Sequence, residues 1–499
     1  MASAFWSGDQ SRRIKARVVV EGELVLQTPA HFGNGDGDYL TDMPLLLDPL
    51  DGRTPLLTGA SIAGALRSNL RARQKGHNYP LPKAENTAAV KQERESAAVK
   101  LFGGFKGDDD GEQSPLIIDD AFGRNYGIEL RDGVRISPES RTAANDAKFD
   151  LQLWEAGTAF DLRFELVICE QQTATETTTH EQELKQALAT ALNGLTDGEV
   201  TLGARKRCGY GRVNVTQWRV REYDLTKVKD LSDWIEHGNE PLPDQFAVTN
   251  LQTKLGELQT FADARSSFKI NATFSLDGSL LIRSGSGQDD TGPDTVHLHA
   301  RQVDGTRQAV LSGTSLAGAL RARALKIANT LGKAKATALI ERMFGKTERA
   351  SKVSVSEQIL QGATTNLVQN RVSIDRFTGG ARDTALFNEQ PAFGDDETLS
   401  TVDIRLINPE KCEIGLLLLL LKDLWTGDLP LGGESSVGRG RLKGKSATLT
   451  YSNSGAAQDW TIAVVGNGLT VKNENGADAR AALETFVGAL NAELKGATP

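Results

Sequence analysis

Residues 57–73 read LTGASIAGALRSNLRAR, and residues 311–323 read LSGTSLAGALRAR. The two segments keep register without a gap, although they lie in opposite halves of the chain. Such self-similarity within one chain indicates a duplicated structural unit. This repeat decides the predicted fold, and the other motifs are interpreted around it.

A second pair of motifs follows the first pair in the same order. Residues 202–213 (LGARKRCGYGRV) match residues 431–442 (LGGESSVGRGRL). Duplication explains two ordered pairs better than chance does. The sequence therefore predicts a first copy over residues 1–220, a linker over residues 221–261, a second copy over residues 262–450 and a C-terminal extension over residues 451–499.

Strand-like patterns surround these motifs. Each copy opens with alternating apolar and polar residues, over 17–26 and 267–276, which is typical of an antiparallel strand with one buried face. Each Gly-x-Ser motif then begins a helix, with Ser61 and Ser315 as the predicted N-caps. Further strands are expected later in each copy, so the predicted fold class is α+β.

Composition and charge limit the possible functions. The 499 residues carry a net charge of −8, which argues against a free-standing nucleic-acid binder but leaves room for local basic stripes. The three distant cysteines have no metal-binding spacing and indicate reduced thiols. No signal peptide is visible, and the apolar run 414–421 is too short to cross a bilayer. We expect a cytoplasmic protein with no membrane partner.

The repeated motifs supply positive charge that suits a nucleic-acid backbone. A helix start offers free N–H groups to phosphate, and glycine-rich loops allow close backbone approach. A solvated helix face or an ordinary glycine hairpin remains the alternative, because the spacing fits neither a P-loop nor a Rossmann fingerprint. The residues expected to contact nucleic acid are Ser61, Arg67, Arg71, Arg205, Arg207, Arg212, Ser315, Arg321, Arg323, Arg439 and Arg441.

The sequence contains no catalytic triad and no cluster of metal-binding residues. Among its 6 histidines, His297 and His299 are two residues apart and could be metal ligands, but we interpret them as exposed strand residues. Acidic residues gather instead in the loop before each Gly-x-Ser helix, although turn formation would also explain them. They are Asp36, Asp38, Asp42 and Asp48 in the first copy, and Asp289, Asp290 and Asp294 in the second.

The order of these motifs resembles the CRISPR RAMP superfamily over about residues 15–220 and 262–450. More narrowly, each copy resembles the repeating backbone subunit of type III effector complexes. Residues 41–52 (TDMPLLLDPLDG) are similar to that family's loop, and residues 372–381 (VSIDRFTGGA) with 386–389 (LFNE) are similar to a second hallmark. Residues 134–143 form a weaker counterpart in the first copy. The tandem fusion looks like the type III-D variant systems.

The resemblance implies a fold and a set of RNA partners. It implies two ferredoxin-like, RRM-derived domains that line a guide CRISPR RNA, each with a β-hairpin thumb, near residues 135–154 and 376–393. Arg376 lies in the second hallmark and joins the expected RNA contacts. The implied partners are the guide RNA, a complementary single-stranded target RNA and the other subunits of the complex, with base pairing carrying sequence specificity.

The resemblance also implies cleavage of the target RNA. Asp42, in Thr-Asp-Met-Pro, falls on the family's cleaving aspartate. Asp294 takes the corresponding position if a small insertion at Thr306 and Arg307 is allowed, although the following proline is missing. Both aspartates would hold Mg²⁺ or Mn²⁺ in a metal-dependent endoribonuclease. Two rivals remain open: an architectural subunit without catalysis, and a guide-processing endonuclease that would use an early histidine, for which His31 is the candidate.

Overall fold

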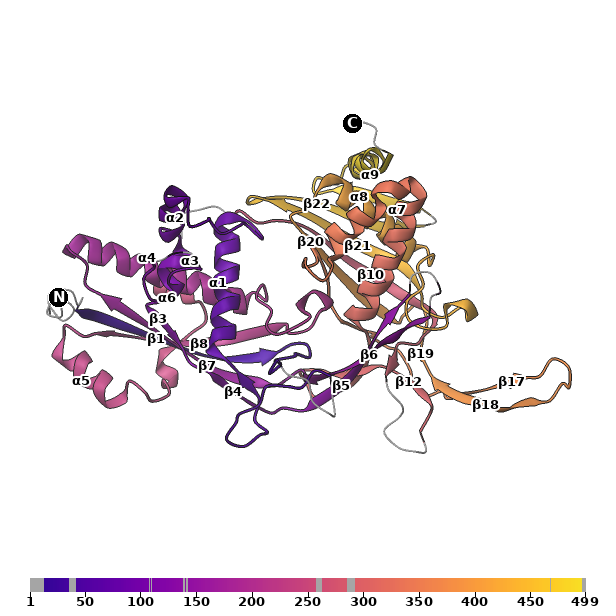
Figure 1. The fold of residues 1–499 in the computed structure, drawn as a ribbon, viewed down its shortest axis with the longest axis horizontal. Helices are drawn as coiled ribbons and strands as arrows, with labels where there is room; N and C mark the ends of the chain where they lie inside the picture. Colours follow the sequence, from indigo (N-terminus) through magenta and orange to yellow (C-terminus); the bar gives the residue numbers. More distant parts are fainter. Residues whose placement is uncertain are drawn as a thin grey trace.

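The computed structural model describes residues 13–35, 42–106, 108, 110–137, 140, 142–256, 263–284, 292–466 and 468–495. It contains two large antiparallel sheets, one in each half of the chain, and helices pack on one face of each sheet (Figure 1). The predicted α+β class with an antiparallel sheet in each copy is therefore confirmed.

The elements follow the same course in both halves. The first half contains β1 (Ile14–Leu26), β2 (Leu56–Leu57), α1 (Gly59–Lys75), α2 (Thr87–Arg94), α3 (Ala97–Phe102), β3 (Leu116–Ile118), β4 (Ala121–Arg124), β5 (Ile128–Ile136), β6 (Ala143–Trp154), β7 (Ala159–Cys169), α4 (Ala174–Thr196), η2 (Lys206–Cys208) and β8 (Val213–Asp224). The connection contains α5 (Val228–His237), η3 (Asp244–Phe246), β9 (Ala247–Val248) and α6 (Leu251–Leu255).

The second half contains β10 (Ser266–Leu280), β11 (Arg283–Ser284), β12 (Thr295–His297), β13 (His299–Arg301), β14 (Arg307–Leu311), α7 (Gly313–Phe344), β15 (Val353–Val355), β16 (Gln358–Ile359), β17 (Gln369–Ile374), β18 (Ala381–Gln390), β19 (Ala392–Gly394), β20 (Leu399–Ile407), α8 (Lys411–Trp425), η4 (Ser435–Val437), β21 (Arg441–Asn453), β22 (Ala456–Val465), β23 (Gly468–Asn473) and α9 (Arg480–Lys495).

The two sheets share a central arrangement. The first has the order β2-β4-β7-β1-β8-β9, and the second has the order β15-β20-β10-β21-β22-β23. The opening strand of each copy lies between the same two later strands, β7 and β8 or β20 and β21, and all of these pairs are antiparallel. Strands β22 and β23 extend the second sheet, so the first part of the predicted C-terminal extension continues this sheet and α9 follows it.

Alternating burial explains why one face of each sheet carries helices. In β1, Val18, Val20 and Leu24 are fully buried and pack with Leu66 and Leu70 of α1. In β10, Phe268, Ile270 and Phe274 are also fully buried, and they pack against α7 and α8 in a separate core. Side chains on a strand alternate between faces, so the intervening residues point to the opposite face of the sheet.

The helix caps lie three residues before the predicted positions. The side chains of Thr58 and Ser312 accept hydrogen bonds from the backbone amides of Ser61 and Ser315, each at 3.3 Å. Thr58 and Ser312 are therefore the N-caps, and the prediction of Ser61 and Ser315 as caps was wrong. An N-cap hydroxyl characteristically bonds the amide two or three residues further on, so the hydroxyl before the glycine is the better placed of the two.

The connection between the copies covers the outer face of the first sheet. Val19 is fully buried beneath Leu242, Trp234 and Phe246 of this segment. The Arg17 guanidinium lies 4.3 Å from the centre of the Trp234 ring, and β9 pairs with the edge of β8. Among the residues that the structure describes, no comparable segment covers the outer face of the second sheet, and this face lines the cleft described below.

A long β-hairpin rises from each copy. The first is formed by β5 and β6 and the second by β17 and β18. They begin at Ile128 and Gln369, several residues before the segments expected from the sequence. Figure 1 shows the first hairpin between the two copies, whereas the second extends away from the body of the protein.

Buried ion pairs hold the first hairpin against the second copy. Arg131 of β5 bonds Glu357, with 2.9 Å between Nη2 and Oε1, and both side chains are only 5% exposed. Burial alone would lower the pKa of Arg131, but the charges of Glu357 and Glu129 outweigh it and raise that pKa well above its ordinary value. Glu155 pairs with Arg307 at 2.6 Å, so the copies are joined at several points.

Candidate nucleic-acid interface and cleavage sites

Asp42 and Asp294 lie at corresponding positions at the base of the two hairpins. The Oδ2 atom of Asp42 accepts a hydrogen bond of 2.9 Å from the backbone amide of Asp150 in β6. The Oδ2 atom of Asp294 accepts one of 2.8 Å from the backbone amide of Asn388 in β18. The next residues along the chain also pair in parallel in each copy. Met43 pairs with Leu151, and Thr295 pairs with Glu389. Both aspartates are exposed.

The residues around these two aspartates differ in charge. In the first copy, Asp150 pairs across the hairpin with Asp132. In the second copy, the corresponding cross-strand pair is Asn388 with Asn370. The pKa of Asp150 is raised, chiefly by a hydrogen bond with Asp132 and also by the nearby charge of Asp42. Two further carboxylates therefore lie near Asp42, whereas two amides lie near Asp294.

The carboxylate oxygens at Asp42 can supply some of the ligands that a hard divalent cation needs. Carboxylate oxygens are the ligands that Mg²⁺ prefers, and Mg²⁺ commonly keeps several waters beside one or two carboxylates. Within the described ranges of the chain, no three His, Cys, Asp or Glu side chains come together as a metal site. An ion at Asp42 or Asp294 would therefore take most of its ligands from water and from an RNA phosphate.

The remaining acidic residues singled out from the sequence do not add to these sites. Asp48 accepts a hydrogen bond of 2.9 Å from the amide of Leu50 and so stabilises a turn. Asp36, Asp38, Asp289 and Asp290 lie outside the described residues.

The histidines considered from the sequence are structural. His31 is 4% exposed, and its Nδ1 atom lies 2.8 Å from the carbonyl oxygen of Gln152. His297 is 1% exposed and contacts the amide of Ile282 and the carbonyl of Val310. Burial lowers the pKa of His297 to about 4, with the neighbouring His299 contributing. The interpretation of His297 as an exposed strand residue was wrong, because its strand faces the core.

Several of the expected RNA contacts are bonded to the protein itself. Arg67 donates to the carbonyls of Gly103 and Gly104, and Arg71 pairs with Glu93 at 2.7 Å. Arg323 pairs with Asp423 at 2.6 Å. Arg439 is 4% exposed and pairs with Glu434 at 2.7 Å. These side chains order the fold around the motifs and are not directed at a free surface.

Other expected contacts remain accessible. Arg205 is exposed, with its guanidinium 4.3 Å from the centre of the Phe149 ring on the first hairpin. Arg321 on α7, Arg376 in the turn of the second hairpin and Arg441 at the start of β21 are also exposed. Ser61 and Ser315 lie near the helix starts, where their hydroxyls contact the capping side chains of Thr58 and Ser312.

The helix starts themselves are occupied by protein groups. The amide of Gly59 donates to Asp120 at 2.7 Å. At Gly313, an added Cβ would lie 2.0 Å from the carbonyl oxygen of Cys208, so this helix start packs against the first copy. Phosphate binding at these helix starts, expected from the sequence, is therefore not supported by the geometry.

The two glycine-rich loops share one backbone conformation. The amides of Gly211 and Gly440 donate to the carbonyls of Pro29 and Ser279, at 2.9 and 2.7 Å. The loop also has a left-handed residue at the same position, Arg205 in one copy and Glu434 in the other. At Gly211 (φ +70°) an added Cβ would lie 1.8 Å from the carbonyl of Leu202, so only glycine fits there.

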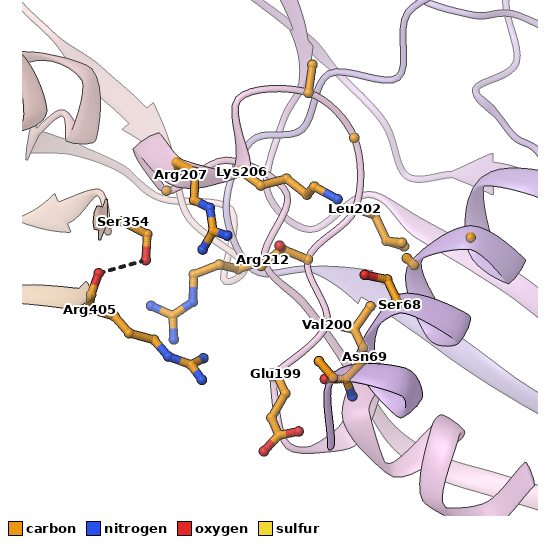
Figure 2. Close-up of a pocket in the computed structure, with 18 of the residues that line it drawn as sticks. Ser68, Asn69, Glu199, Val200, Leu202, Lys206, Arg207, Arg212, Ser354 and Arg405 are labelled. Atoms are coloured by element: carbon orange, nitrogen blue, oxygen red, sulfur yellow. Dashed lines mark hydrogen bonds between the residues drawn. The ribbon is translucent and has the colours of Figure 1, made fainter. Parts of the chain in front are cut away.

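A cleft of about 1520 Å³ separates the two copies. Its walls are α1, the first glycine-rich loop and the outer face of the second sheet, and one end reaches Asp42. Figure 2 shows Arg207 and Arg212 of the loop extending toward Arg405 of β20. Arg207 and Arg212 were expected from the sequence, whereas Arg405 and the neighbouring Lys269 were not.

The repeat seen in the fold coincides with a known family. The sequence profile of the RAMP superfamily matches residues 23–214 and 273–443, which together are well over half of the chain. The chain belongs to the RAMP superfamily. No curated protein matches the chain. Each matched segment runs from the opening strand of one copy to the strand after its glycine-rich loop.

RAMP superfamily membership implies a subunit that binds guide RNA in a CRISPR effector complex. The superfamily also includes nucleases, so membership is compatible with cleavage without showing it. In the described part of this RAMP protein, no helix is long and apolar enough to cross a membrane.

The RAMP repeat also explains why Lys269 and Arg405 were missed. Lys269 lies in an alternating strand pattern that was recognised, but only the register of β10 with β20 brings it opposite Arg405. Only the packing of the two copies directs both residues at the glycine-rich loop.

Proposed function

We propose that this chain is a guide-RNA-binding backbone subunit of a type III CRISPR effector complex, with two RAMP copies fused as in the type III-D variant systems. It cleaves the complementary target RNA at Asp42 and Asp294. Each copy follows the β-α-β-β-α-β order of a ferredoxin-like domain, and its β-hairpin is the thumb that separates segments of the guide–target duplex. Neighbouring subunits of the complex would continue the backbone at either end.

The observation that carries the proposal is the shared position of the two aspartates. Each is exposed at the base of a hairpin, and one carboxylate oxygen is fixed by a backbone amide of the returning strand. A fixed carboxylate loses less conformational entropy when the substrate binds. Positioning of this kind lowers the barrier of the reaction. The same arrangement in both copies favours a shared role over a turn residue that occurs by chance.

Each site needs only a small set of protein groups, because RNA supplies its own nucleophile. A nucleotide displaced at the hairpin base can present its 2′-hydroxyl in line with the adjacent phosphorus. The aspartate accepts the hydroxyl proton while the 2′-oxygen–phosphorus bond forms. The bond from phosphorus to the 5′-oxygen breaks, and that oxygen takes a proton from water. General base catalysis of this kind contributes about 10²–10⁴-fold.

A divalent cation would complete the charge balance of the site. Mg²⁺ or Mn²⁺ held by Asp42 or Asp294 would offset negative charge that develops on the phosphate. The side chains of Asp132 and Asp150 stand beside Asp42 and would strengthen its hold on a cation, whereas Asn370 and Asn388 stand beside Asp294.

The test uses the assembled complex with guide and target RNA. Asp42→Ala combined with Asp294→Ala should leave guide and target binding unchanged while removing the cuts that this subunit makes. Asp51→Ala with Asp304→Ala is the matched control, because both are exposed turn aspartates bonded to a threonine. Unchanged cleavage in the first variant would identify the chain as an architectural subunit without catalysis.

A further inference from the structure

The outer face of the second sheet differs in charge from that of the first. The glycine-rich loops bond Pro29 in one copy and Ser279 in the other, which aligns the opening strands. Counting back along these strands, Lys269 takes the position of Val19. Lys269 pairs in register with Arg405, and Val19 pairs with Glu165. Two cations in the second copy thus replace one apolar residue and one acid in the first.

The two faces also differ in what covers them. In the first copy, Val19 is buried beneath the connection between the copies, and Glu165 is ion-paired with Arg17. In the second copy, Lys269 is exposed, and both Lys269 and Arg405 line the cleft opposite the first glycine-rich loop. The loop contributes Arg207 and Arg212 to the same space (Figure 2).

Four cations therefore meet in the cleft with few carboxylates to balance them. Within the described residues, Arg207, Arg212, Lys269 and Arg405 form no ion pair, and the buried Nε atom of Arg405 has no hydrogen-bond partner. Arg212 donates to the hydroxyl of Ser356 at 3.3 Å. Asp403 lines the same part of the cleft and offsets one of the four charges. A cleft lined by cations that lack ion-pair partners attracts counter-ions, so this arrangement points to an anionic ligand.

Of the other acidic groups that line the cleft, Glu199 and Asp263 are neutralised by arginines, whereas Asp42 and Asp197 add two carboxylates to the lining. Glu199 pairs with Arg265 and Arg73, each at 2.9 Å. Burial alone would raise the pKa of Glu199, but these two guanidinium groups lower it to about 2. Asp263 is likewise bonded to Arg265 at 2.5 Å. Glu199 and Asp263 therefore do not compensate the cations on the opposite wall, and those cations outnumber the remaining carboxylates of the lining.

Burial lowers the pKa values of Arg207, Arg405 and His77, and neighbouring positive charges also lower those of Arg405 and His77. The pKa of Arg207 is lowered by burial. The pKa of Arg405 is lowered by burial and by the charges of Arg265 and Arg207. His77 lies near the same arginines, and burial together with Arg405 lowers its pKa to about 4. A phosphate group in the cleft would relieve this repulsion.

We propose that the cleft binds phosphodiester groups of an RNA strand between cations of both copies, Arg207 and Arg212 from the first and Lys269 and Arg405 from the second. This inference rests on the proposed RNA-binding function and adds the outer face of the second sheet to the RNA path. Because the equivalent face of the first copy is covered and neutralised, each chain contains one such composite site. The tandem arrangement builds that site within a single polypeptide.

The experiment measures binding of the full chain to a 5′-labelled single-stranded RNA by fluorescence anisotropy over a series of salt concentrations. Lys269→Gln with Arg405→Gln should weaken binding about tenfold or more. The slope of log Kd against log salt should fall by about 0.7 for each lost phosphate contact. Lys333→Gln with Lys335→Gln is the control, since it removes equal charge from exposed positions of α7 outside the cleft. Thermal melting checks that both variants fold.

The outcomes separate this inference from the function on which it rests. Arg207→Gln with Arg212→Gln provides the comparison on the loop side of the cleft. Suppose that this variant no longer binds RNA, while Lys269→Gln with Arg405→Gln binds RNA with the affinity of the control. The proposal of a composite site is then wrong, but the proposed RNA-binding function stands. If the unaltered chain binds no RNA, alone or in the complex, both proposals fail. Adenosine monophosphate that competes as strongly as unlabelled RNA would also contradict the proposal. The cleft would then be a binding site for a free nucleotide and not for an RNA strand.

Discussion

The two hairpins share one backbone design but differ in charge and in attachment. At the base of each hairpin, an exposed aspartate bonds the amide of the returning strand. Two further carboxylates, Asp132 and Asp150, accompany the first aspartate, whereas Asn370 and Asn388 accompany the second. Duplication has thus preserved the position of one carboxylate while the electrostatics around it diverged.

A buried arginine that bonds each hairpin shows the second difference: Arg131 belongs to the first hairpin, and Arg439 lies in the glycine-rich loop beside the second. Arg131 lies between Glu129 of its own strand and Glu357 of the other copy. Arg439 lies between Glu434 and Glu389, both of its own copy. The first hairpin is therefore part of the contact between the copies, and the second is stabilised locally and extends outward (Figure 1). Similar chemistry serves assembly in one case and local order in the other.

Breaking the buried pair between the copies should have the largest effect on stability. Glu357→Gln leaves Arg131 buried without one of its two counter-charges, and breaking a buried pair typically costs about 3–5 kcal/mol. Urea unfolding of the full chain measures the loss. Glu434→Gln is the matched change in the second copy, and it should cost less because Glu434 is 16% exposed against 5% for Glu357. An equal cost for both would contradict the distinction between the hairpins.

Making the second site acidic should change its response to Mg²⁺. Asn370→Asp with Asn388→Asp reproduces the carboxylates of the first site. Each added charge is worth about 1 kcal/mol near 4 Å in water, less with salt. The Mg²⁺ concentration that half-saturates the second copy's cut should therefore fall about tenfold, with the first copy's cut as the internal control. An unchanged Mg²⁺ response would show that these neighbours play no part in holding the cation.

Repulsion between Asp132 and Asp150 in the first hairpin should lower the free energy of unfolding by less than the loss of the buried ion pair does. Asp132→Asn copies Asn370 and should stabilise the protein at pH 7 by about 0.2–1 kcal/mol, since like charges opposite each other in a hairpin repel. The pKa of Asp150 is raised above 3.8 in the folded state, so the native fold favours the protonated carboxyl and loses stability as pH rises through that pKa.

The pH dependence of unfolding checks this explanation. The gain from Asp132→Asn should shrink as the pH falls through the raised pKa of Asp150, because protonation of Asp150 removes the repulsion. The reverse pair of changes, Asn370→Asp with Asn388→Asp, should destabilise the second hairpin only at the higher pH, because it creates the like-charged pair. A gain from Asp132→Asn that does not vary with pH would exclude charge repulsion as its cause.

The features predicted correctly from the sequence are those encoded by local pattern. The duplication, the antiparallel sheets and the helices after Gly59 and Gly313 follow from motif order and apolar periodicity. The N-cap prediction failed because Thr58 and Ser61 are both hydroxyl residues, and only the path of the chain shows which one precedes the helix.

The features that the sequence did not reveal depend on contacts between distant residues. Arg323 is bonded to Asp423, one hundred positions later, and no local pattern distinguishes it from the exposed Arg321. The match of Asp294 with Asp42 required an assumed insertion in the sequence comparison, whereas the hairpin register aligns the two directly. The cations Lys269 and Arg405 acquire meaning only when the second sheet faces the first copy.

The most direct test of this account maps the target-RNA cuts made by complexes that carry Asp42→Asn or Asp294→Asn alone. Each variant should lose one cut, by about 10²–10⁴-fold, and retain the cut made by the other copy. The two lost cuts should differ in position along the target. Loss of both cuts in either single variant, or retention of both cuts in either one, would contradict the claim that each copy cleaves RNA with its own aspartate.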